Sequence, residues 1–391
     1  MLRSIADSIG IGKYPDELDA IYESIRTCTK PACDIALIES LQLEYNLFEE
    51  YYETVLNVAN AINKDTDRSA WIKTVVAFVK DKNVAQARRV PVPKADGTQI
   101  TALLPLFVLL PQIPLGIESY RGRGFSDEEI RRLLKAFSGG IKTVESQTGM
   151  PGINALYYHW LTLYVKAAIF NTDGLQFELR TLPDAIIYLK NRNSGDVVLL
   201  PTQGTFHKSG EQILGSPGYI DSYGSFDADF SEEDRAYYGH PIINSIAKNK
   251  REEFLKADWV CVARPGDMCL SIHIPRGADI SVENMNRAVS SAREIVKTRY
   301  PEHTGLMVFG SSWILDPTIA KLLGENSNIS RMQDLFYTYP QKCGGMGAFG
   351  YVFPKNFDSF ESLPENTSLQ RKLKKHYING GYIYDFAGLI I

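Results

Sequence analysis

The chain has 391 residues, and its 42 Lys and Arg residues are nearly balanced by 46 Asp and Glu residues, so the formal net charge is −4. Nucleic-acid-binding proteins usually carry a basic excess or a basic stripe, and this sequence shows neither. The length predicts about two domains, and a hydrophobic content of 44% is typical of a globular protein rather than a disordered one.

Cysteine usage and apolar segments argue against a disulfide framework, a metal site and a membrane span. The five cysteines are irregularly spaced and form no C-x-x-C pair. Residues 1–14 lack the apolar core of a signal peptide. The most apolar run, 103–117, is too short for a bilayer and contains three prolines, which we expect to break a helix. We therefore expect a cytoplasmic protein with reduced thiols and no membrane partner.

Residues 1–170 are predicted to form a helical N-terminal domain. Apolar residues recur at three- and four-residue spacings over 34–63, which predicts one long amphipathic helix. A second helix is predicted from an N-cap at Asp67 through Val79, followed by a loop over 90–98. Ser126 and Glu129 have the spacing of a capping box, and a further helix is predicted over 153–168.

Strands dominate from residue 171, so 171–391 is predicted to be a second domain. Alternation predicts a strand over 176–181, with Phe177 and Leu179 on its apolar face and Glu178 on its polar face. Segments 185–189 and 197–200 predict a hairpin. Residues 202–256 are polar and predict a long loop, and two apolar strands follow over 259–263 and 268–274.

The segment 268–309 predicts a βαβ crossover. A strand over 268–274, a helix over 281–300 capped by Ser281 and a strand over 306–309 imply two parallel strands. Helices are expected at 317–323, 329–337 and 368–377, and a strand at 348–353. Together with the hairpin, the crossover predicts a mixed sheet. The fold class is therefore α+β: an all-α N-terminal domain followed by an α/β domain.

Two loops could bind phosphate, and each has an alternative. Residues 120–126 nearly match R-x-x-G-x-G/A, a phosphate-binding loop, but no strand precedes them and acidic residues follow, so an exposed turn before a helix is preferred. The loop after the strand at 268–274 is better placed. Helix amides at 281–283 and Arg276 would face an anion there, although Asp279 and Glu283 repel phosphate.

His273 and Glu178 are the candidate acid–base residues. The six histidines show no metal-ligand spacing, so no metal site is predicted. His273 ends a strand that we expect to be central, where the ligand clefts of α/β folds open. A satisfied buried histidine and a solvated strand carboxylate are the respective alternatives. Residues 310–314 are similar to a hydrolase elbow without its final glycine, and the alternative is a strand end whose serines cap the next turn.

Ordered blocks along nearly the whole chain resemble bacterial acyltransferase domain-containing proteins, which join a helical N-terminal domain to a GNAT-like C-terminal domain. The most specific blocks are LSIHIP at 270–275, SWILDP at 312–317, SNISRMQ at 327–333, and TSLQR at 367–371 with Gly380 and Gly381. Weaker matches are GHPI at 239–242, LQFEL at 175–179 and YRGRG at 120–124.

The resemblance implies an N-acyltransferase that uses acetyl-CoA or another acyl-CoA, without a metal, to acylate a small-molecule or peptide amine. In such enzymes the pantetheine lies between two parting parallel strands, here 268–274 and 306–310. The implied base is His273 or Glu178, and the implied acid is Tyr337. The other implied site residues are Ser312, Trp313 and Asp316 near the acceptor, and Ile274, Arg276, Gly277, Ser281 and Val282 near the cofactor.

Two alternatives stay open. The loop after the strand at 268–274 has few glycines and has acidic residues nearby, which favours a non-catalytic GNAT-like ligand-binding or scaffolding protein. A serine hydrolase would use Ser311 or Ser312. The helical half has three open roles: covering the cleft, selecting the substrate or forming a homodimer.

Overall fold

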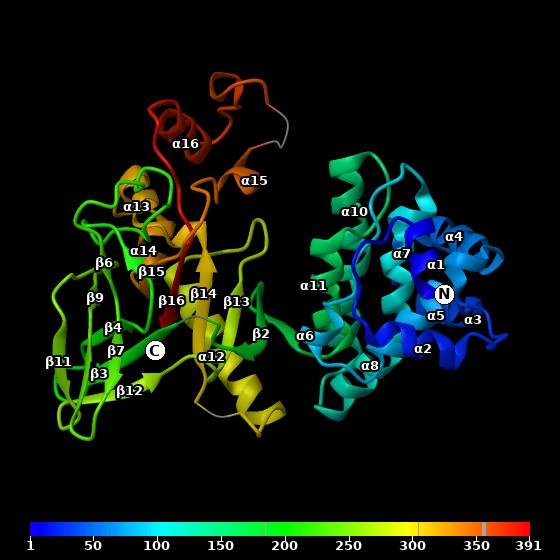
Figure 1. Cartoon of the computed structure of the whole chain (residues 1–391), viewed down its shortest axis with the longest axis horizontal. Coiled ribbons are helices and arrows are strands. Elements are labelled where there is room, and N and C mark those ends of the chain that lie inside the picture. Colours follow the sequence, from blue (N-terminus) through cyan, green and yellow to red (C-terminus); the bar gives the residue numbers. More distant parts are fainter. Residues whose placement is uncertain (184, 304, 354–356) are drawn as a thin grey trace. The chain divides into compact units, whose positions relative to one another are not determined.

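A computed structural model describes residues 1–183, 185–303, 305–353 and 357–391, and the chain divides into two units, Met1–Phe170 and Asn171–Ile391 (Figure 1). Helices make up the first unit, and a mixed β-sheet organises the second. The α+β class expected from the sequence is confirmed.

Capping residues set many of the helix boundaries in the first unit. The Asp65 carboxylate, rather than the predicted Asp67, caps α5 and accepts a hydrogen bond from the Arg68 amide at 2.9 Å, while Asp67 lies in the first turn. The predicted capping box of Ser126 and Glu129 begins α9. The helices are α1 (Leu2–Ser8), α2 (Glu17–Ile25), α3 (Ile35–Tyr45), α4 (Tyr52–Lys64), α5 (Thr66–Val79), α6 (Val84–Ala87), α7 (Gln99–Leu109), α8 (Ile113–Gly122), α9 (Asp127–Leu134), α10 (Ala136–Thr148) and α11 (Ala155–Val165), with 3-10 turns η1 (Glu49–Tyr51) and η2 (Leu110–Gln112).

One further helix prediction is wrong, and another holds only in part. The segment 34–63 is not one helix, because Asn46 adopts a left-handed conformation with φ of 49° and ends α3. The apolar segment is interrupted near Pro111, where the 3-10 turn η2 separates α7 from α8, but Pro105 lies inside α7 without breaking it. Pro111 and Pro114 lie in the first turns of η2 and α8, where a missing N–H costs little. Gln99–Gly122 is long and apolar enough to cross a membrane, but 72% of an 18-residue apolar window within it is buried inside the protein, as in a core helix.

The second unit contains two main sheets. One has the order β1-β2-β13-β14-β16-β15 and the other β10-β9-β4-β3-β12. The strands are β1 (Ile169–Thr172), β2 (Leu175–Thr181), β3 (Ile186–Asn191), β4 (Val197–Pro201), β5 (Thr205–Phe206), β6 (Phe226–Asp227), β7 (Phe230–Glu232), β8 (Ala236–Gly239), β9 (Ile242–Ile243), β10 (Ile246–Ala247), β11 (Glu252–Leu255), β12 (Trp259–Ala263), β13 (Met268–His273), β14 (Met307–Ser312), β15 (Tyr337–Pro340) and β16 (Phe386–Ile390).

The predicted hairpin is confirmed as β3–β4, and the predicted crossover as β13, α12 (Val282–Arg299) and β14. Three predictions are wrong. Residues 202–256 hold the short strands β5 to β11 rather than one loop, the helix expected to reach residue 337 ends at Gln333, and 348–353 contains a helix rather than a strand. The remaining helices are α13 (Pro317–Leu323), α14 (Asn328–Gln333), α15 (Phe349–Val352) and α16 (Ser368–Ile378), with 3-10 turns η3 (Trp313–Leu315) and η4 (Phe360–Ser362).

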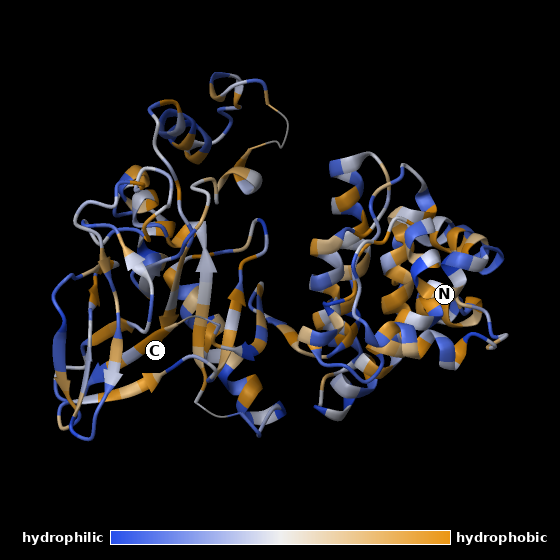
Figure 2. Ribbon diagram, viewed as in Figure 1, coloured by the Kyte–Doolittle hydropathy of each residue, from blue (hydrophilic) through white to orange (hydrophobic). Residues whose placement is uncertain are grey.

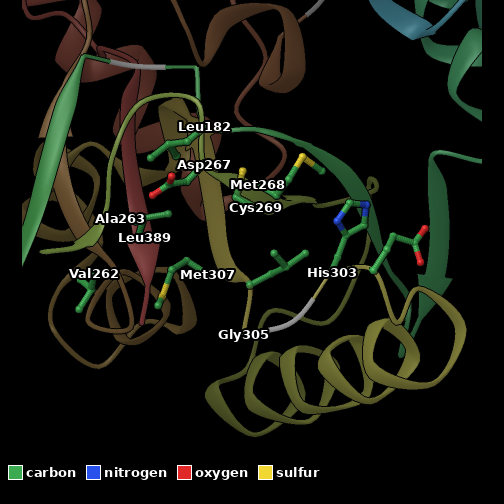
Figure 3. Close-up of a pocket in the computed structure, with 12 residues that line it drawn as sticks. Leu182, Val262, Ala263, Asp267, Met268, Cys269, His303, Gly305, Met307 and Leu389 are labelled. Atoms are coloured by element: carbon green, nitrogen blue, oxygen red, sulfur yellow. The ribbon is translucent and has the colours of Figure 1, made fainter.

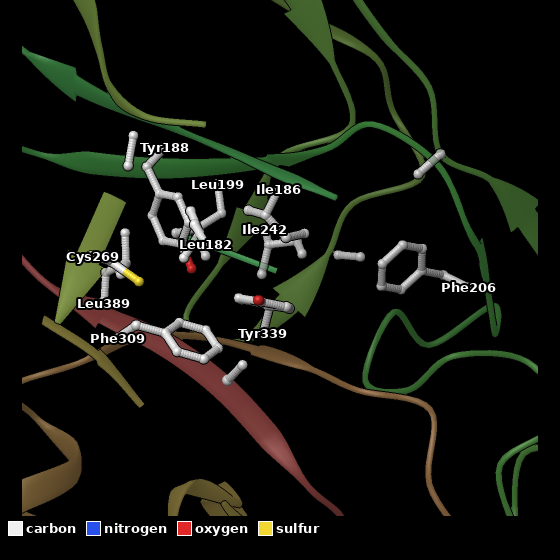
Figure 4. Close-up of a cluster of buried hydrophobic side chains, with 14 of the residues drawn as sticks. Leu182, Ile186, Tyr188, Leu199, Phe206, Ile242, Cys269, Phe309, Tyr339 and Leu389 are labelled. Atoms are coloured by element: carbon white, nitrogen blue, oxygen red, sulfur yellow. The ribbon is translucent and has the colours of Figure 1, made fainter. Parts of the chain in front are cut away.

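The core of this unit lies between the two sheets. Side chains from β13, β14, β15 and β16 meet side chains from β3, β4 and β9 in one buried cluster (Figure 4). Figure 2 shows that β12 and β13 are mainly apolar, as expected for strands that contribute to this core. The cluster includes Cys269, Phe309, Ala387 and Leu389 from the six-stranded sheet, so one face of that sheet is covered along most of its length.

Candidate active site

The parallel pairing of β13 and β14 ends before either strand does. Only Cys269, Leu270 and Ser271 pair with β14, opposite Met307, Val308 and Phe309. Beyond that level, β13 remains paired with β2 up to His273, and β14 remains paired with β16 up to Ser312. The central pair of the sheet therefore parts at its C-terminal ends, between two strands that are each held on their outer side (Figure 1).

Side chains approach the parting from the face that carries Ile272. A Cβ added to Gly310 would lie 2.8 Å from the Phe336 ring and 3.5 Å from Ile272 Cγ2. Glycine at this position lets both side chains pack against the β14 backbone. The opposite face carries Ser271 and His273, because successive side chains of a strand alternate between faces.

Glu178 and His273 are brought together on that opposite face by two adjacent antiparallel strands. Glu178 lies opposite Ser271, and His273 lies opposite Gln176, so the two side chains are diagonal neighbours. His273 Nε2 is 3.0 Å from Glu178 Oε2, with 29% of the histidine side chain and 6% of the glutamate side chain exposed. The solvated position considered for Glu178 is wrong, because only 6% of its side chain is exposed.

This arrangement suits proton transfer. A buried carboxylate is stable only when hydrogen-bonded or paired, and the imidazole provides that partner. In return, the carboxylate fixes the orientation and tautomer of the ring, as the acidic member of a catalytic triad does. The imidazole of His273 is therefore oriented by Glu178 at the place where β13 and β14 separate.

The predicted phosphate loop joins β13 to α12. Gly277 has a φ of 81°, which favours glycine, and the Ala278 amide donates to the Pro275 carbonyl at 3.0 Å in a tight turn. Ser281 caps α12 and accepts from the Asn284 amide, as predicted, and Val282 begins the helix. Ile274 directly follows β13, and Arg276 is exposed at the turn.

A carboxylate already occupies part of this helix terminus. Asp279 Oδ1 accepts a hydrogen bond from the Ser281 amide at 2.9 Å, and that contact lowers the pKa of Asp279. The Ser281 amide is one of the backbone groups that the sequence predicts to bind phosphate. An anion bound there would have to displace the Asp279 side chain.

Ser312 and Trp313, expected near the acceptor, line a pocket of about 330 Å³ at the end of β14. The pocket also contains four residues that no sequence pattern singles out: Gln341, Lys342, Tyr351 and Asp385. Asp385 precedes β16, a strand that the sequence does not predict, so a polar residue before a short apolar run was the only available signal.

Asp316, also expected near the acceptor, is a buried residue that accepts backbone hydrogen bonds. It is 2% exposed, and its two carboxylate oxygens each accept a backbone hydrogen bond at 2.7 Å, from the Thr318 and Tyr384 amides. Burial raises the pKa of Asp316, while the two amides oppose that rise. The side chain thus begins α13 and ties it to the segment before β16.

Tyr337 is not brought to the Glu178–His273 pair. It begins β15, which is separated from β13 by β16 and β14, and it lies opposite Leu389. At about 4.8 Å per strand spacing, three spacings place it about 14 Å from β13. A role as the acid that protonates the leaving thiolate therefore receives no support from the geometry.

The hydrolase arrangement also lacks its geometry. Ser311 Oγ donates to Gln341 Oε1 at 2.6 Å, and Ser312 Oγ accepts from the Ile314 amide at 3.3 Å. Within the described part of the chain, no hydrogen bond joins either hydroxyl to an imidazole. Both serines act as strand-end and capping residues.

Two further features lie away from this site. Arg121, in the segment that resembles a phosphate-binding motif, lies in the last turn of α8 and forms ion pairs with Asp127 at 2.8 Å and Glu44 at 3.3 Å. The exposed turn expected before the next helix is therefore limited to the residues after Gly122. A cavity of about 310 Å³ lies at the N-terminal ends of β13 and β14, opposite the parting, and includes Asp267 and His303 (Figure 3).

Among the described residues, no group of three or more His, Cys, Asp or Glu side chains is placed to hold a metal.

Comparisons with solved structures give full-length matches. An acyltransferase in complex with decanoyl-CoA and teicoplanin has a TM-score of 0.66, a mutant acyltransferase, orf11*, in complex with octanoyl-CoA has 0.66, and an acyltransferase in complex with decanoyl-CoA has 0.64. Each match has 16% identity and covers 100% of this chain and 98% of the other. At this identity the likeness shows the fold alone.

A comparison with curated protein sequences gave no match. Residues 169–390, more than half of the chain, match the model of the GNAT-like C-terminal domain. The matched segment contains β2, β13, α12 and β14, which carry the parting strands and the Glu178–His273 pair. The chain therefore belongs to the family of proteins with a GNAT-like C-terminal domain, as its resemblance to acyltransferase domain-containing proteins implies.

Proposed function

We propose that this protein is an acyl-CoA-dependent N-acyltransferase. The observation that carries the proposal is the parting of β13 and β14 beyond Ser271 and Phe309, with a carboxylate-held imidazole at its edge. An acyl-pantetheine arm is narrow and carries amide groups, so it can lie along strand backbone in such a parting. The acyl-CoA complexes of the structurally similar acyltransferases support this choice of donor.

In the proposed reaction, the acceptor amine attacks the thioester carbonyl, a C–N bond forms and the C–S bond breaks. His273 takes the proton that the amine must lose, with Glu178 stabilising the imidazolium. The same imidazole then returns the proton to the CoA thiolate, so no separate acid is required. The backbone N–H of Ile274, directly after β13, is the proposed donor to the oxyanion.

The proposed site for the CoA pyrophosphate is the start of α12. The amides at Ser281 and Val282 and the positive end of the helix dipole attract an anion, and Arg276 adds charge. Gly277 allows the tight turn that brings these groups together. The Asp279 carboxylate competes for the Ser281 amide, and this competition is the observation that favours the second candidate, a non-catalytic GNAT-like ligand-binding protein.

Calorimetry with acetyl-CoA and with longer acyl-CoAs tests the donor, and release of free CoA in the presence of amines tests the reaction. We expect the wild-type protein to bind an acyl-CoA and His273→Ala to bind it equally while losing turnover. Binding without turnover by any amine would favour the ligand-binding candidate. Absence of acyl-CoA binding by the wild-type protein would overturn the proposal.

A further inference from the structure

Strand register places the pocket of Asp385 on the same face and at the same edge of the sheet as His273. Ser271 pairs with Phe309, so His273 and Ser311, two residues further along their strands, share a face. Ser311 lies opposite Ala387, and Asp385 lies two residues before Ala387.

Gln341 joins the same row of side chains. Its amide donates to the Asp385 carbonyl at 3.0 Å, which continues the pairing of β15 with β16 beyond Pro340. The row therefore crosses the sheet from the Glu178–His273 pair to the pocket at the end of β14.

Two aromatic rings and a carboxylate form the wall of this pocket. The rings of Trp313 and Tyr351 are stacked, with centroids 6.3 Å apart and an interplanar angle of 29°. A Cβ added to Gly347 would lie 2.6 Å from Asp385 Oδ1 and 3.0 Å from Trp313 Cβ, so glycine makes room for both side chains. The acidic and aromatic components thus lie within one small volume of about 330 Å³.

The Asp385 carboxylate has no partner of its own among the described residues. Its backbone N–H and carbonyl are used by Cys343 Sγ and the Gln341 amide, but no hydrogen bond or ion pair reaches its side chain. Burial raises the pKa of Asp385, with no other contribution. A half-buried, unpaired carboxylate beside aromatic faces provides the two features that stabilise a bound organic cation.

We propose that this pocket binds a second cationic group of the acceptor, with Asp385 as its counter-ion and Trp313 and Tyr351 as aromatic partners. The inference rests on the proposed acyl transfer, because the first amine must reach His273. Asp385 is two strand spacings from β13 and two residues beyond the level of His273, so the two residues are about 12 Å apart. The acceptor class is therefore a diamine, or a larger polyamine, whose two nitrogens are separated by roughly that distance.

Lys342 also lines the pocket, and its charge opposes a bound cation. Its Nζ lies 3.7 Å from the position of a Cβ on Gly215. No ion pair with Asp385 is present in the described part of the chain. Removing this charge should therefore strengthen cation binding, and removing the charge of Asp385 should weaken it.

The test is calorimetry in the presence of free CoA, which needs no turnover. Straight-chain diamines from diaminobutane to diaminodecane are compared with monoamines of equal length. We expect one diamine length to bind best. Asp385→Asn should weaken that binding about tenfold without affecting the monoamine, and Lys342→Gln should strengthen it. Tyr351 is 73% exposed, so Tyr351→Ala should fold normally and weaken the diamine a few-fold.

Equal binding of diamines and monoamines, or diamine binding that is unchanged in both Asp385→Asn and Tyr351→Ala, would overturn the inference. Release of CoA from acyl-CoA is measured separately with the same amines. Turnover of monoamines and diamines at equal KM would support the acyltransferase proposal and contradict only the proposal that the pocket binds a cation. Diamine binding without acyl-CoA binding would contradict the acyltransferase proposal and support the proposal that the pocket binds a cation.

Discussion

Replacing Glu178 with glutamine should slow acyl transfer without unfolding the sheet. Glutamine has nearly the same shape and can still contact His273, but it lacks the charge that stabilises the imidazolium. The contact is 3.0 Å long and only 6% of the Glu178 side chain is exposed, so solvent screens it little. A charge-assisted hydrogen bond contributes about 1.5–3 kcal/mol. Since 1.36 kcal/mol corresponds to a tenfold rate change, kcat should fall roughly 10- to 150-fold.

The assay follows CoA release with a thiol reagent, after acyl-CoA binding has been measured for each variant. Glu294→Gln is the matched control, because this carboxylate on α12 is 61% exposed and its ion pair among the described residues is with Lys297, across one turn. We expect kcat of the control to equal that of the wild type. A Glu178→Gln variant that folds normally and keeps full kcat, while His273→Ala is inactive, would refute the role of the pair.

Three further predictions concern the cofactor loop, stability and thiol chemistry. Arg276→Glu should weaken acyl-CoA binding several-fold by calorimetry and Asp279→Asn should strengthen it, whereas unchanged affinities in both would exclude this loop as the phosphate site. Asp316→Ala should lower the free energy of unfolding in urea by about 1–3 kcal/mol, because two buried amides lose their acceptor. Since burial raises the pKa of Asp316 above 3.8, the contribution of this group to native stability should fall as pH rises from about 3.8 through the raised pKa. A variant with the same pH slope of unfolding free energy as the wild type would contradict this. Burial also raises the pKa of Cys33 to about 12, so iodoacetamide near neutral pH should label exposed Cys28 and spare Cys33 by peptide mass spectrometry, and equal labelling would count against the burial.

Local signals predicted the crossover that holds the candidate site. Ser281 caps α12 as expected, and the apolar strands on either side are parallel, because short right-handed crossovers allow few other arrangements. The position of His273 at a strand end follows from the same pattern. These features depend on residues close together in the sequence.

The partners of His273 depend on contacts that no local pattern encodes. Alternation places Glu178 on the face of β2 opposite to Phe177 and Leu179, but it does not show that the Glu178 side chain is buried there. The place of Asp385 in the site could not be predicted for a related reason. It precedes β16, a short strand whose position between β14 and β15 is set by long-range pairing.

Packing also overrode local propensity in two helical segments. Pro105 lies inside α7 where residues 103–109 are all buried, so packing offsets the lost hydrogen bond, and the other two prolines fall in the first turns of η2 and α8. Residues 348–353 are predicted to form a strand, yet α15 forms there, with Phe349 packed against Phe353 and Tyr377.

The Glu178–His273 contact joins residues that are 95 positions apart. Closing so long a stretch of chain costs entropy before any contact repays it, so this pairing should form late during folding. The reactive centre then assembles only after the intervening strands have settled into the second sheet. Conversely, a brief separation of β2 from β13 would dismantle the dyad while the N-terminal helices stayed intact, which makes enzymatic competence a more sensitive reporter of this sheet than helical content.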